Sequence, residues 1–344
     1  MRQTLALTGD IMLRNVRDPG KPFAGEDSAD VILGNLEGCL YDSDEGRLQR
    51  ESPPPKDISQ SPPLKSRRYD AGTAAAPFLA KMGFDAVGCA NNVTFGAEAI
   101  LASLAVLDEM GIGHAGAGAD RLSARAPAIV EKDGVRIGFL QYTSTYSPIG
   151  HEAAEGNPGV ATVKAYTAYQ PHHDVLQMPG AAATALTWAD AEQLGAMQED
   201  IERLSRNVDV VVASYHWGVG LEIRPTQYQV EIAHAAIDAG AGLVMGHGPH
   251  VVQPVEMYRD TPVFYGLGDF ATRNQRIGLV AWVGLEGRDI DSLACSPVGH
   301  DPDTGRTIIR NPADEPETVE VLQETSREFG TELRVENGRL VVVA

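Results

Sequence analysis

The sequence AGLVMGHGPH, residues 241–250, joins an apolar run to a turn rich in glycine and proline that carries two histidines. The apolar run has the length and composition of a buried strand. His247 and His250 stand three residues apart, so their imidazoles can converge on one point. Convergent groups of this kind at the carboxyl edge of a sheet form metal or anion sites. We therefore expect a functional turn here; the alternative is one exposed histidine and one buried structural histidine.

Two other segments repeat this arrangement. Residues 210–215 (VVVASY) have the pattern of a buried strand and are followed by His216, and residues 4–8 (TLALT) run directly into Gly9 and Asp10. Three strand ends that each deliver an aspartate or a histidine favour a shared site over coincidence. The alternative is that these side chains only hydrogen-bond the strand ends to one another.

Composition restricts the class of protein. The chain has 344 residues, 43% of them hydrophobic, and a formal net charge of −19. Such a field repels nucleic acid and anionic membrane, so we expect neither as a partner and expect a small-molecule or peptide substrate instead. No apolar run approaches the ~18 residues of a membrane span, and the first residues lack the pattern of a secretory signal. These features predict a cytoplasmic protein; they leave the oligomeric state open.

The cysteines give no sign of a metal site or of a disulfide framework. Cys39, Cys89 and Cys295 have no metal-type spacing and cannot all pair with one another. Cys39 and Cys89 lie beside apolar runs, so we expect reduced cysteines in the core.

Strand and helix patterns alternate along the chain, which predicts one α/β domain over residues 1–344. Residues 43–70 are rich in proline, serine and charge and form a long loop excursion, either a lid or a surface insertion. Its basic group could attract an anionic substrate or balance local acidic charge (Lys65, Arg67, Arg68). Residues 277–344 form a C-terminal extension of a hairpin, a helix and a strand.

Periodicity and capping residues locate the individual elements. Helices are predicted at residues 73–82, 97–110, 190–206, 226–239 and 317–329. Strands are predicted at residues 86–90, at 263–270, at 340–343, and in a hairpin of residues 128–130 and 135–140 whose turn is Lys132-Asp133-Gly134. Residues 151–186 show no regular pattern and are expected to be irregular.

Seven short motifs occur in a fixed order along the chain and carry a family resemblance. They are GDIML (9–13), NLEG (35–38), ANN (90–92), GAG (116–118), HWG (216–218), GHGPHV (246–251) and YGLGDF (265–270). In these motifs the chain resembles the CapA family of capsule-biosynthesis, or poly-γ-glutamate synthesis, proteins, which is similar to calcineurin-like metallophosphoesterases. The resemblance covers roughly the first 275 residues. It implies a four-layer sandwich of two mixed β-sheets flanked by helices, with the site at the carboxyl ends of central strands.

The chain also departs from the pattern that the resemblance implies. Two-metal phosphoesterases of this superfamily have Asp-x-His in the first motif, where this chain has Met12 in place of the histidine. Val93 and Gly248 stand at further positions where CapA-like proteins often have histidine, and Asp269 stands where asparagine is common. A dinuclear site that clamps both the attacking and the leaving oxygen is therefore not expected.

The remaining groups predict a mononuclear site. Two carboxylates and three imidazoles suit one Zn²⁺, Mn²⁺ or Fe²⁺ ion with an open position for water. The predicted ligands are Asp10, Glu37, His216, His247 and His250, and the predicted catalytic residues are Asp10, Glu37, His216 and His250. A metal-bound water would act as the nucleophile, and Glu37 or Asp269 would take its proton. The predicted function is hydrolysis of a small or peptide-like acidic substrate, an amide or ester before a phosphoester.

Two other functions stay open at this stage. Without a metal, a carboxylate and a histidine on opposite sides of a substrate could remove and return a proton next to a carbonyl, as in an epimerase or isomerase. Alternatively, the protein could be a non-catalytic accessory factor that binds an acidic polymer in capsule biosynthesis, although the net charge opposes such a partner.

Further side chains are candidates for substrate binding. We expect contributions from Asn91, Asn92, Trp217, Arg224, Asp269 and Arg273, the arginines as clamps on a carboxylate or phosphate. The sequence HHD (172–174) is a candidate lid element, and the hydroxyl-rich residues 142–146 follow a strand that ends at the same edge of the sheet.

Overall fold

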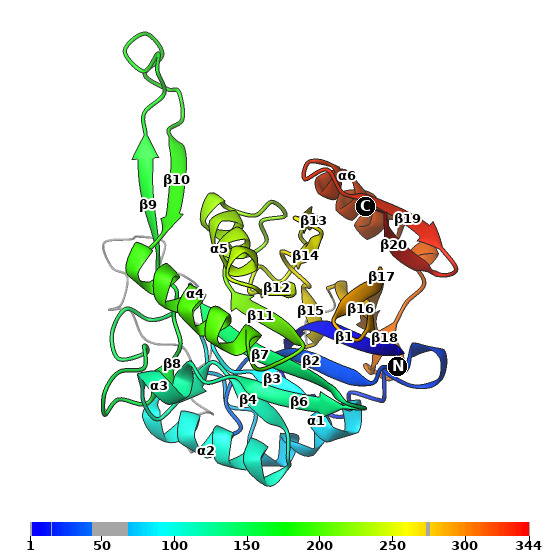
Figure 1. The fold of residues 1–344 in the computed structure, drawn as a ribbon. Coiled ribbons are helices and arrows are strands. Elements are labelled where there is room, and N and C mark those ends of the chain that lie inside the picture. Colours follow the sequence, from blue (N-terminus) through cyan, green and yellow to red (C-terminus); the bar gives the residue numbers. More distant parts are fainter. Residues whose placement is uncertain (1, 15, 43–67, 273–275, 344) are drawn as a thin grey trace.

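The computed structural model describes residues 2–14, 16–42, 68–272 and 276–343 (Figure 1). Its strands belong to two large sheets and two small ones. The strands of the first large sheet are β1 (Arg2–Ile11), β2 (Val31–Leu36), β3 (Ala86–Gly88), β4 (Gly113–Ala115), β15 (Asp269–Ala271), β16 (Gly278–Glu286), β17 (Asp289–His300), β18 (Thr307–Ile309), β19 (Glu332–Glu336) and β20 (Arg339–Val343). Those of the second are β6 (Ala128–Lys132), β7 (Val135–Thr143), β11 (Val210–His216), β12 (Leu243–His247), β13 (Val255–Tyr258) and β14 (Thr261–Phe264).

Both large sheets mix parallel and antiparallel neighbours. The first has the order β19-β20-β17-β16-β1-β2-β3-β4, with β15 beside β1 and β18 beside β17, and the second has the order β13-β14-β12-β11-β7-β6. In the first sheet β1 is parallel to β2 and antiparallel to β16. In the second sheet β11 is parallel to both β7 and β12. Because β16 pairs with the central strand β1, the C-terminal segment is built into the sheet.

Helices cover the outer faces of the two sheets (Figure 1). They are α1 (Pro77–Met82), α2 (Ala97–Glu109), α3 (Arg121–Ala124), α4 (Ala191–Ser205), α5 (Gln227–Asp238) and α6 (Pro316–Arg327). Short 3₁₀ helices occur at Gly25–Asp27, Thr73–Ala75 and Pro312–Asp314. Each predicted helix is present, although the first begins as a 3₁₀ turn and becomes α-helical at Pro77, whose missing N–H suits a helix start.

Successive side chains of a strand point to opposite faces of its sheet, so the buried hydrophobic residues form three separate cores. Leu5 and Leu7 of β1 pack with Phe139 and Met245 in the core between the two sheets. Ala6 points to the opposite face, into a second core that α1 and α2 cover, and a third core lies between β11, β12 and the helices α4 and α5. Strands buried on both faces read as continuous apolar runs. The predicted four-layer fold with two mixed sheets is confirmed.

A ribbon of two antiparallel strands occupies part of the segment 151–186, which was expected to be irregular throughout. It consists of β9 (Ala165–Gln170) and β10 (Thr184–Ala189), and it projects from the body beside α4 (Figure 1). The expectation was wrong because both faces of the ribbon are largely exposed, so its strands lack the apolar alternation that marks a half-buried strand. A smaller pair, β5 (Ala117–Gly118) and β8 (Gly159–Val160), lies near α3.

Two other sequence-based expectations can be compared with the described residues. Cys39 and Cys89 are free and buried, as expected, and Cys295 is free and buried as well; burial raises the pKa of the Cys89 thiol to about 12. Of the basic group, Lys65 and Arg67 lie outside the described residues; Arg68 pairs with Asp70 at 2.9 Å. Among the helices of the described ranges, none is both long and apolar enough to cross a bilayer.

Candidate metal and acid/base site

The five predicted ligand residues come together where strands of both sheets end. Asp10 lies at the end of β1 and Glu37 directly after β2, while His216 and His247 are the last residues of β11 and β12 and stand side by side in register. His250 follows on the turn after β12. Four of the five are buried, and 22% of the His250 side chain is exposed, which leaves one side of the cluster open to solvent.

Asp10 lies at the centre of the cluster. Its Oδ2 is 3.2 Å from His250 Nδ1, and its Oδ1 is 3.6 Å from His247 Nδ1. The amide of Asn35 donates a 2.7 Å hydrogen bond to the same Oδ1. The Asp10 carboxylate therefore contacts His247 at the end of β12 and His250 on the turn that follows, and it also accepts from Asn35 of β2. Because β1 and β12 belong to different sheets, Asp10 links the two sheets.

Glu37 faces the other side of the histidines. Its Oε1 is 3.6 Å from His250 Nε2 and 3.7 Å from His216 Nε2. Its Oε2 is buried and has no hydrogen-bond partner among the described residues. Polar atoms of four side chains thus surround one small region: Glu37 Oε1, His216 Nε2, His250 Nε2 and the Asp10 carboxylate.

The backbone of the turn is bent to aim His250 inward. Gly248 has φ +102°, and a Cβ at this position would lie 2.7 Å from the carbonyl oxygen of Trp217. His250 has φ +58°, a left-handed conformation that is rare for residues other than glycine. Strain of this kind is retained where the surrounding contacts fix it, often at functional sites. The close approach of Trp217 also explains why a histidine cannot replace Gly248 in this turn without moving its neighbour.

Burial and charge give the ionisable groups different protonation states. Burial lowers the pKa of His247 to about 4, so its imidazole is neutral at pH 7. Burial also opposes the charge of His250, but hydrogen bonds to Asp10 and Asp269 prevail and raise its pKa to about 12. The pKa of Asp10 lies well below its usual range because the His250 hydrogen bond and the histidine charges outweigh burial. Burial and the Asp10 charge raise the pKa of Glu37.

The donor set fits a divalent metal ion. One ligand atom each from Asp10, Glu37 and His250 lies within 4.8 Å of the other two. His216 Nε2 and both ring nitrogens of His247 are buried without a hydrogen-bond partner among the described residues. Unpaired buried polar atoms are costly, and a ligand or ion that they bind removes the cost. Imidazole nitrogen and carboxylate oxygen are ligands of Zn²⁺, Mn²⁺ and Fe²⁺.

Residues around the cluster fix the orientation of the histidine rings. Thr145 Oγ1 is 2.6 Å from His216 Nδ1, and Asp269 Oδ1 is 2.9 Å from His250 Nδ1. In both rings the partner holds Nδ1 and leaves Nε2 directed toward Glu37. Outer partners of this type select the tautomer of a metal-binding histidine. Asp269, predicted near the site, is confirmed in this position, opposite Asp10 in the β1–β15 register.

Sequence reasoning missed two buried amides that support the cluster. Gln141 Nε2 donates a 2.9 Å hydrogen bond to Asn35 Oδ1, and its Oε1 accepts from the backbone N–H of Ala90. This orients the Asn35 amide so that its Nδ2 points at Asp10. A Cβ on Gly88 would lie 2.1 Å from the Gln141 side chain, so the glycine makes room for the bridge. A polar residue at the end of an otherwise apolar strand was the available signal.

Removing the Thr145 hydroxyl tests the role of the outer partners. Thr145→Val keeps the shape of the side chain but loses the hydrogen bond to His216, so we expect metal affinity to fall ~10–100-fold. Thr145→Ser keeps the hydroxyl and should retain the affinity. Competition with a chromophoric chelator measures both variants. Equal affinity in the valine variant and the wild type would show that Thr145 does not orient His216.

The predicted substrate-binding residues have different positions. Asn91 is buried and fully engaged, since its amide donates to the Leu36 carbonyl and its oxygen accepts from Thr94, whereas Asn92 Oδ1 is buried without a partner in the described chain. Trp217 is not a pocket wall: it is 0% exposed and donates to the Tyr265 carbonyl.

The two arginines do not join the cluster in the described structure. Arg224 is exposed, and its guanidinium forms hydrogen bonds of 2.5 and 2.9 Å with Glu328, so its assignment as an anion clamp is corrected: the acidic partner already holds it. Arg273 lies outside the described residues. The predicted lid element His172-His173-Asp174 lies on the segment between β9 and β10, away from the cluster.

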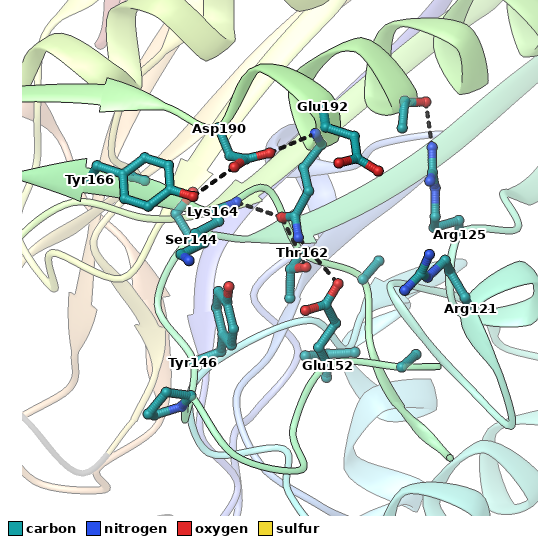
Figure 2. A pocket seen from close by; sticks show the side chains of 17 residues that line it. Arg121, Arg125, Ser144, Tyr146, Glu152, Thr162, Lys164, Tyr166, Asp190 and Glu192 are labelled. Carbon is teal, nitrogen blue, oxygen red and sulfur yellow. Dashed lines mark hydrogen bonds between the residues drawn. The ribbon is translucent and has the colours of Figure 1, made fainter. Parts of the chain in front are cut away.

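A polar cavity of about 520 Å³ lies among residues near α3, β9 and the start of α4, and none of the five cluster residues lines it (Figure 2). Ser144 and Tyr146, which flank Thr145, line it. The cations Arg121 and Lys164 and the carboxylates Glu152, Asp190 and Glu192 line it as well. Its wall therefore shares a backbone segment with the residue that holds His216.

Comparison with known proteins gives one family and several distant relatives. Residues 4–274 match the family described as bacterial capsule synthesis protein PGA_cap. The uncharacterized protein y4sH of Sinorhizobium fredii is 28% identical in a match that covers 78% of this chain and 65% of that protein. This chain thus spans less than two thirds of that relative's length.

Two further matches concern named proteins. The PGA biosynthesis protein CapA of Bacillus subtilis is 27% identical in a match that covers 89% of this chain and 76% of that protein. Among solved structures, the NAD nucleotidase NadN of Haemophilus influenzae aligns with a TM-score of 0.40 and 11% identity over 94% of this chain and 63% of that one. A likeness of that strength carries no argument about activity.

Proposed function

This chain belongs to the bacterial capsule synthesis protein family, and on that premise we propose that it is a hydrolase that uses one divalent metal ion. Asp10, Glu37, His216, His247 and His250 would hold the ion. The substrate would be a small or peptide-like acidic molecule, cleaved at an amide or ester bond.

The observation that carries this proposal is the set of unpaired, buried ligand atoms around Asp10. His216 Nε2, His247 Nδ1 and Nε2, and Glu37 Oε2 lack hydrogen-bond partners in the described chain. If the side chains only held the strand ends together, these atoms would be expected to bond to one another. The separations of 3.6–3.7 Å between Glu37 and the two Nε2 atoms are too long for good hydrogen bonds.

In this proposal the residues of the cluster have different chemical roles. A bound divalent ion would activate water near neutral pH and polarise the scissile carbonyl. Glu37 has a raised pKa and a free Oε2, which suits it to take up a proton during attack and to return it to the leaving group. Asp10 anchors the histidines of the β12 turn, and Asp269 holds His250 by its Nδ1.

The cavity that Ser144 and Tyr146 line is a candidate site for a part of the substrate that does not react. Its volume of about 520 Å³ is within the ~300–1,000 Å³ of small-molecule sites. Its wall carries both signs of charge, since the basic side chains of Arg121, Arg125 and Lys164 are matched there by the carboxylates of Glu152, Asp190 and Glu192. An acidic substituent of the substrate would bind there through the basic side chains.

Metal content tests the proposal directly. We expect the purified protein to carry about one equivalent of Zn²⁺, Mn²⁺ or Fe²⁺ by elemental mass spectrometry, and His247→Ala to carry almost none because a neutral, buried ligand is lost. His114→Ala, a histidine outside the cluster, should keep the metal. Hydrolysis of acidic amides and esters should stop after chelation and return with Zn²⁺ or Mn²⁺. Two equivalents would point to a dinuclear phosphoesterase instead.

One observation favours a metal-free alternative. His250 is held as a cation between Asp10 and Asp269, and its Nε2 lies 3.6 Å from the Glu37 carboxyl group. A protonated imidazole opposite a carboxylate could exchange a proton next to a carbonyl, as an epimerase does. Metal-free protein that exchanges a substrate α-proton for deuterium, followed by NMR, would establish this function and exclude the hydrolase.

A third function follows from the relatives' names rather than from the site. The Bacillus subtilis relative is named a PGA biosynthesis protein. A non-catalytic role in capsule assembly would leave the buried ligand atoms without a purpose, so we place it third. A protein that binds metal but turns over no amide, ester or phosphoester would move it to first place.

A further inference from the structure

His151 is a buried histidine outside the Asp10 cluster, and both of its ring nitrogens have a partner. Nε2 lies 2.8 Å from the carbonyl oxygen of Thr94, and the backbone N–H of Ser147 donates to Nδ1 at 2.9 Å. A carbonyl oxygen can only accept a hydrogen bond, so Nε2 carries the proton. The ring with these two hydrogen bonds, called here the His151 brace, joins two backbone segments that are far apart in the sequence.

The surroundings keep the brace in one state. Burial lowers the pKa of His151, so its ring is neutral at pH 7 and Nδ1 can accept. The Phe95 ring packs edge-on against the imidazole with 5.0 Å between the centroids, and Tyr146 lies on it at 6.5 Å. The imidazole is therefore held in a fixed orientation and tautomer.

The Thr94 end of the brace leads to Glu37. Thr94 lies in the turn after β3, a strand of the first large sheet. Its hydroxyl is 3.2 Å from the Gly38 carbonyl oxygen and 2.9 Å from Asn91 Oδ1, and Asn91 Nδ2 donates to the Leu36 carbonyl at 2.8 Å. Leu36 and Gly38 are the two chain neighbours of Glu37. This turn therefore fixes the backbone from which the Glu37 carboxylate projects.

The Ser147 end of the brace leads to His216. Ser147 lies two residues after Thr145, on the segment that follows β7 of the second large sheet. Thr145 Oγ1 is 2.6 Å from His216 Nδ1, and the N–H of Ser144 donates to the His216 carbonyl at 2.9 Å. This segment therefore fixes both the ring and the backbone of His216.

Glu37 and His216 come from different sheets and meet in the cluster, where Glu37 Oε1 is 3.7 Å from His216 Nε2. The groups of a functional site must be held within ~0.5 Å of their productive positions by the residues around them. Asp10 connects the sheets through its contacts with His247 and His250. The His151 brace connects the turn that holds Glu37 to the segment that holds His216.

We propose that His151 is a positioning residue that sets the separation of Glu37 from His216 for metal binding. It is not one of the five ligands, and it acts through Thr94 and Ser147. This inference rests on the proposed function, because it takes Glu37 and His216 as ligands of one ion.

Two substitutions break this chain of contacts at different points. His151→Phe keeps an aromatic ring but loses both hydrogen bonds, and Thr94→Val keeps the shape of its side chain but loses the hydroxyl beside Gly38. We expect the affinity for Zn²⁺, measured by competition with a chelator, to fall ~10-fold in each variant. The double variant should lose no more than the weaker of the two single variants, because both act through the same contacts.

The visible spectrum of Co²⁺ bound in place of zinc separates positioning from stability. It reports the coordination geometry, which a loss of stability alone does not change, so we expect its d–d bands to shift in both variants. Phe95→Leu is the matched control, because its side chain packs on the same imidazole and cannot form a hydrogen bond. This variant should keep the wild-type affinity and spectrum.

The proposal and the function on which it rests can fail separately. Wild-type affinity and an unchanged Co²⁺ spectrum in His151→Phe would overturn the proposal; if that variant does not fold, the same result in Thr94→Val would overturn it. A wild type that binds neither ion would overturn the proposed function. The ring ¹⁵N NMR signals of His216 then decide the positioning role, which requires that Thr94→Val shifts them and that Phe95→Leu does not.

Discussion

Asp10→Asn is expected to remove the metal and to lower turnover by about a thousandfold. A charged group that acts directly in a site contributes ~10²–10⁴-fold to the rate. Asp10 is 0% exposed, and it is the carboxylate that the histidines of the β12 turn share, through contacts of 3.2 Å with His250 and 3.6 Å with His247. Asparagine has the same shape and can still accept from Asn35, so the fold should persist while the negative charge is lost.

The measurement combines elemental analysis with the rate of hydrolysis of the best acidic amide or ester. Asp303→Asn is the matched control, because this aspartate lies in an exposed turn after β17. Full metal content and full turnover in Asp10→Asn would show that the end of β1 is scaffold only. Normal metal content with lost turnover would instead assign Asp10 to proton transfer and His216, His247 and Glu37 to the metal.

The strand ends could be predicted because two independent patterns coincide in them. The runs before Asp10, His216 and His247 are mostly apolar and almost entirely buried, as is typical of strands covered on both faces, and each leads into an ionisable residue. The sheet topology then brings these residues together, because parallel strands have their carboxyl ends at the same edge of the sheet. The structure accordingly brings together all five residues expected to share the pocket.

The supporting contacts could not be predicted because they depend on geometry between the sheets. The bridge from Gln141 to Asn35 joins β7 of one sheet to β2 of the other, and nothing in either local sequence specifies the pairing. The error at Trp217 has the same origin. Its neighbour His216 faces the site, so Trp217, the next residue, enters the core. Arg224 was misassigned because the sequence does not reveal that Glu328 lies beside it.

The β9–β10 ribbon was missed because its strands lack the sequence pattern on which strand prediction depends. Strand prediction relies on one buried and one exposed face, and β9 and β10 are exposed on both. Their aromatic and β-branched residues were therefore the only local signal.

Gly246→Ala is expected to destabilise the protein by about 3 kcal/mol, although it adds only one methyl group. A Cβ on Gly246 would lie 2.0 Å from the Tyr265 carbonyl oxygen and 2.5 Å from Trp217 Nε1. These are the two atoms of a 2.9 Å hydrogen bond, so the methyl group would enter the bond itself. Overpacking in a core costs ~1–3 kcal/mol, and a buried hydrogen bond adds ~1 kcal/mol.

The same substitution should also disturb the site, since Gly246 precedes His247 on β12 and lies opposite Tyr215 of β11. Thermal unfolding by differential scanning calorimetry measures the effect, with an expected fall in Tm of ~4 °C. Gly180→Ala is the control, because a Cβ there meets no atom within 4 Å, and it should change stability by less than ~0.5 kcal/mol. If both variants unfold at the wild-type temperature, the close approach of β12 to Tyr265 and Trp217 is not a feature of the folded protein. If Gly246→Ala alone is destabilised and also loses metal, the hydrogen bond beneath the β12 turn positions the histidines above it.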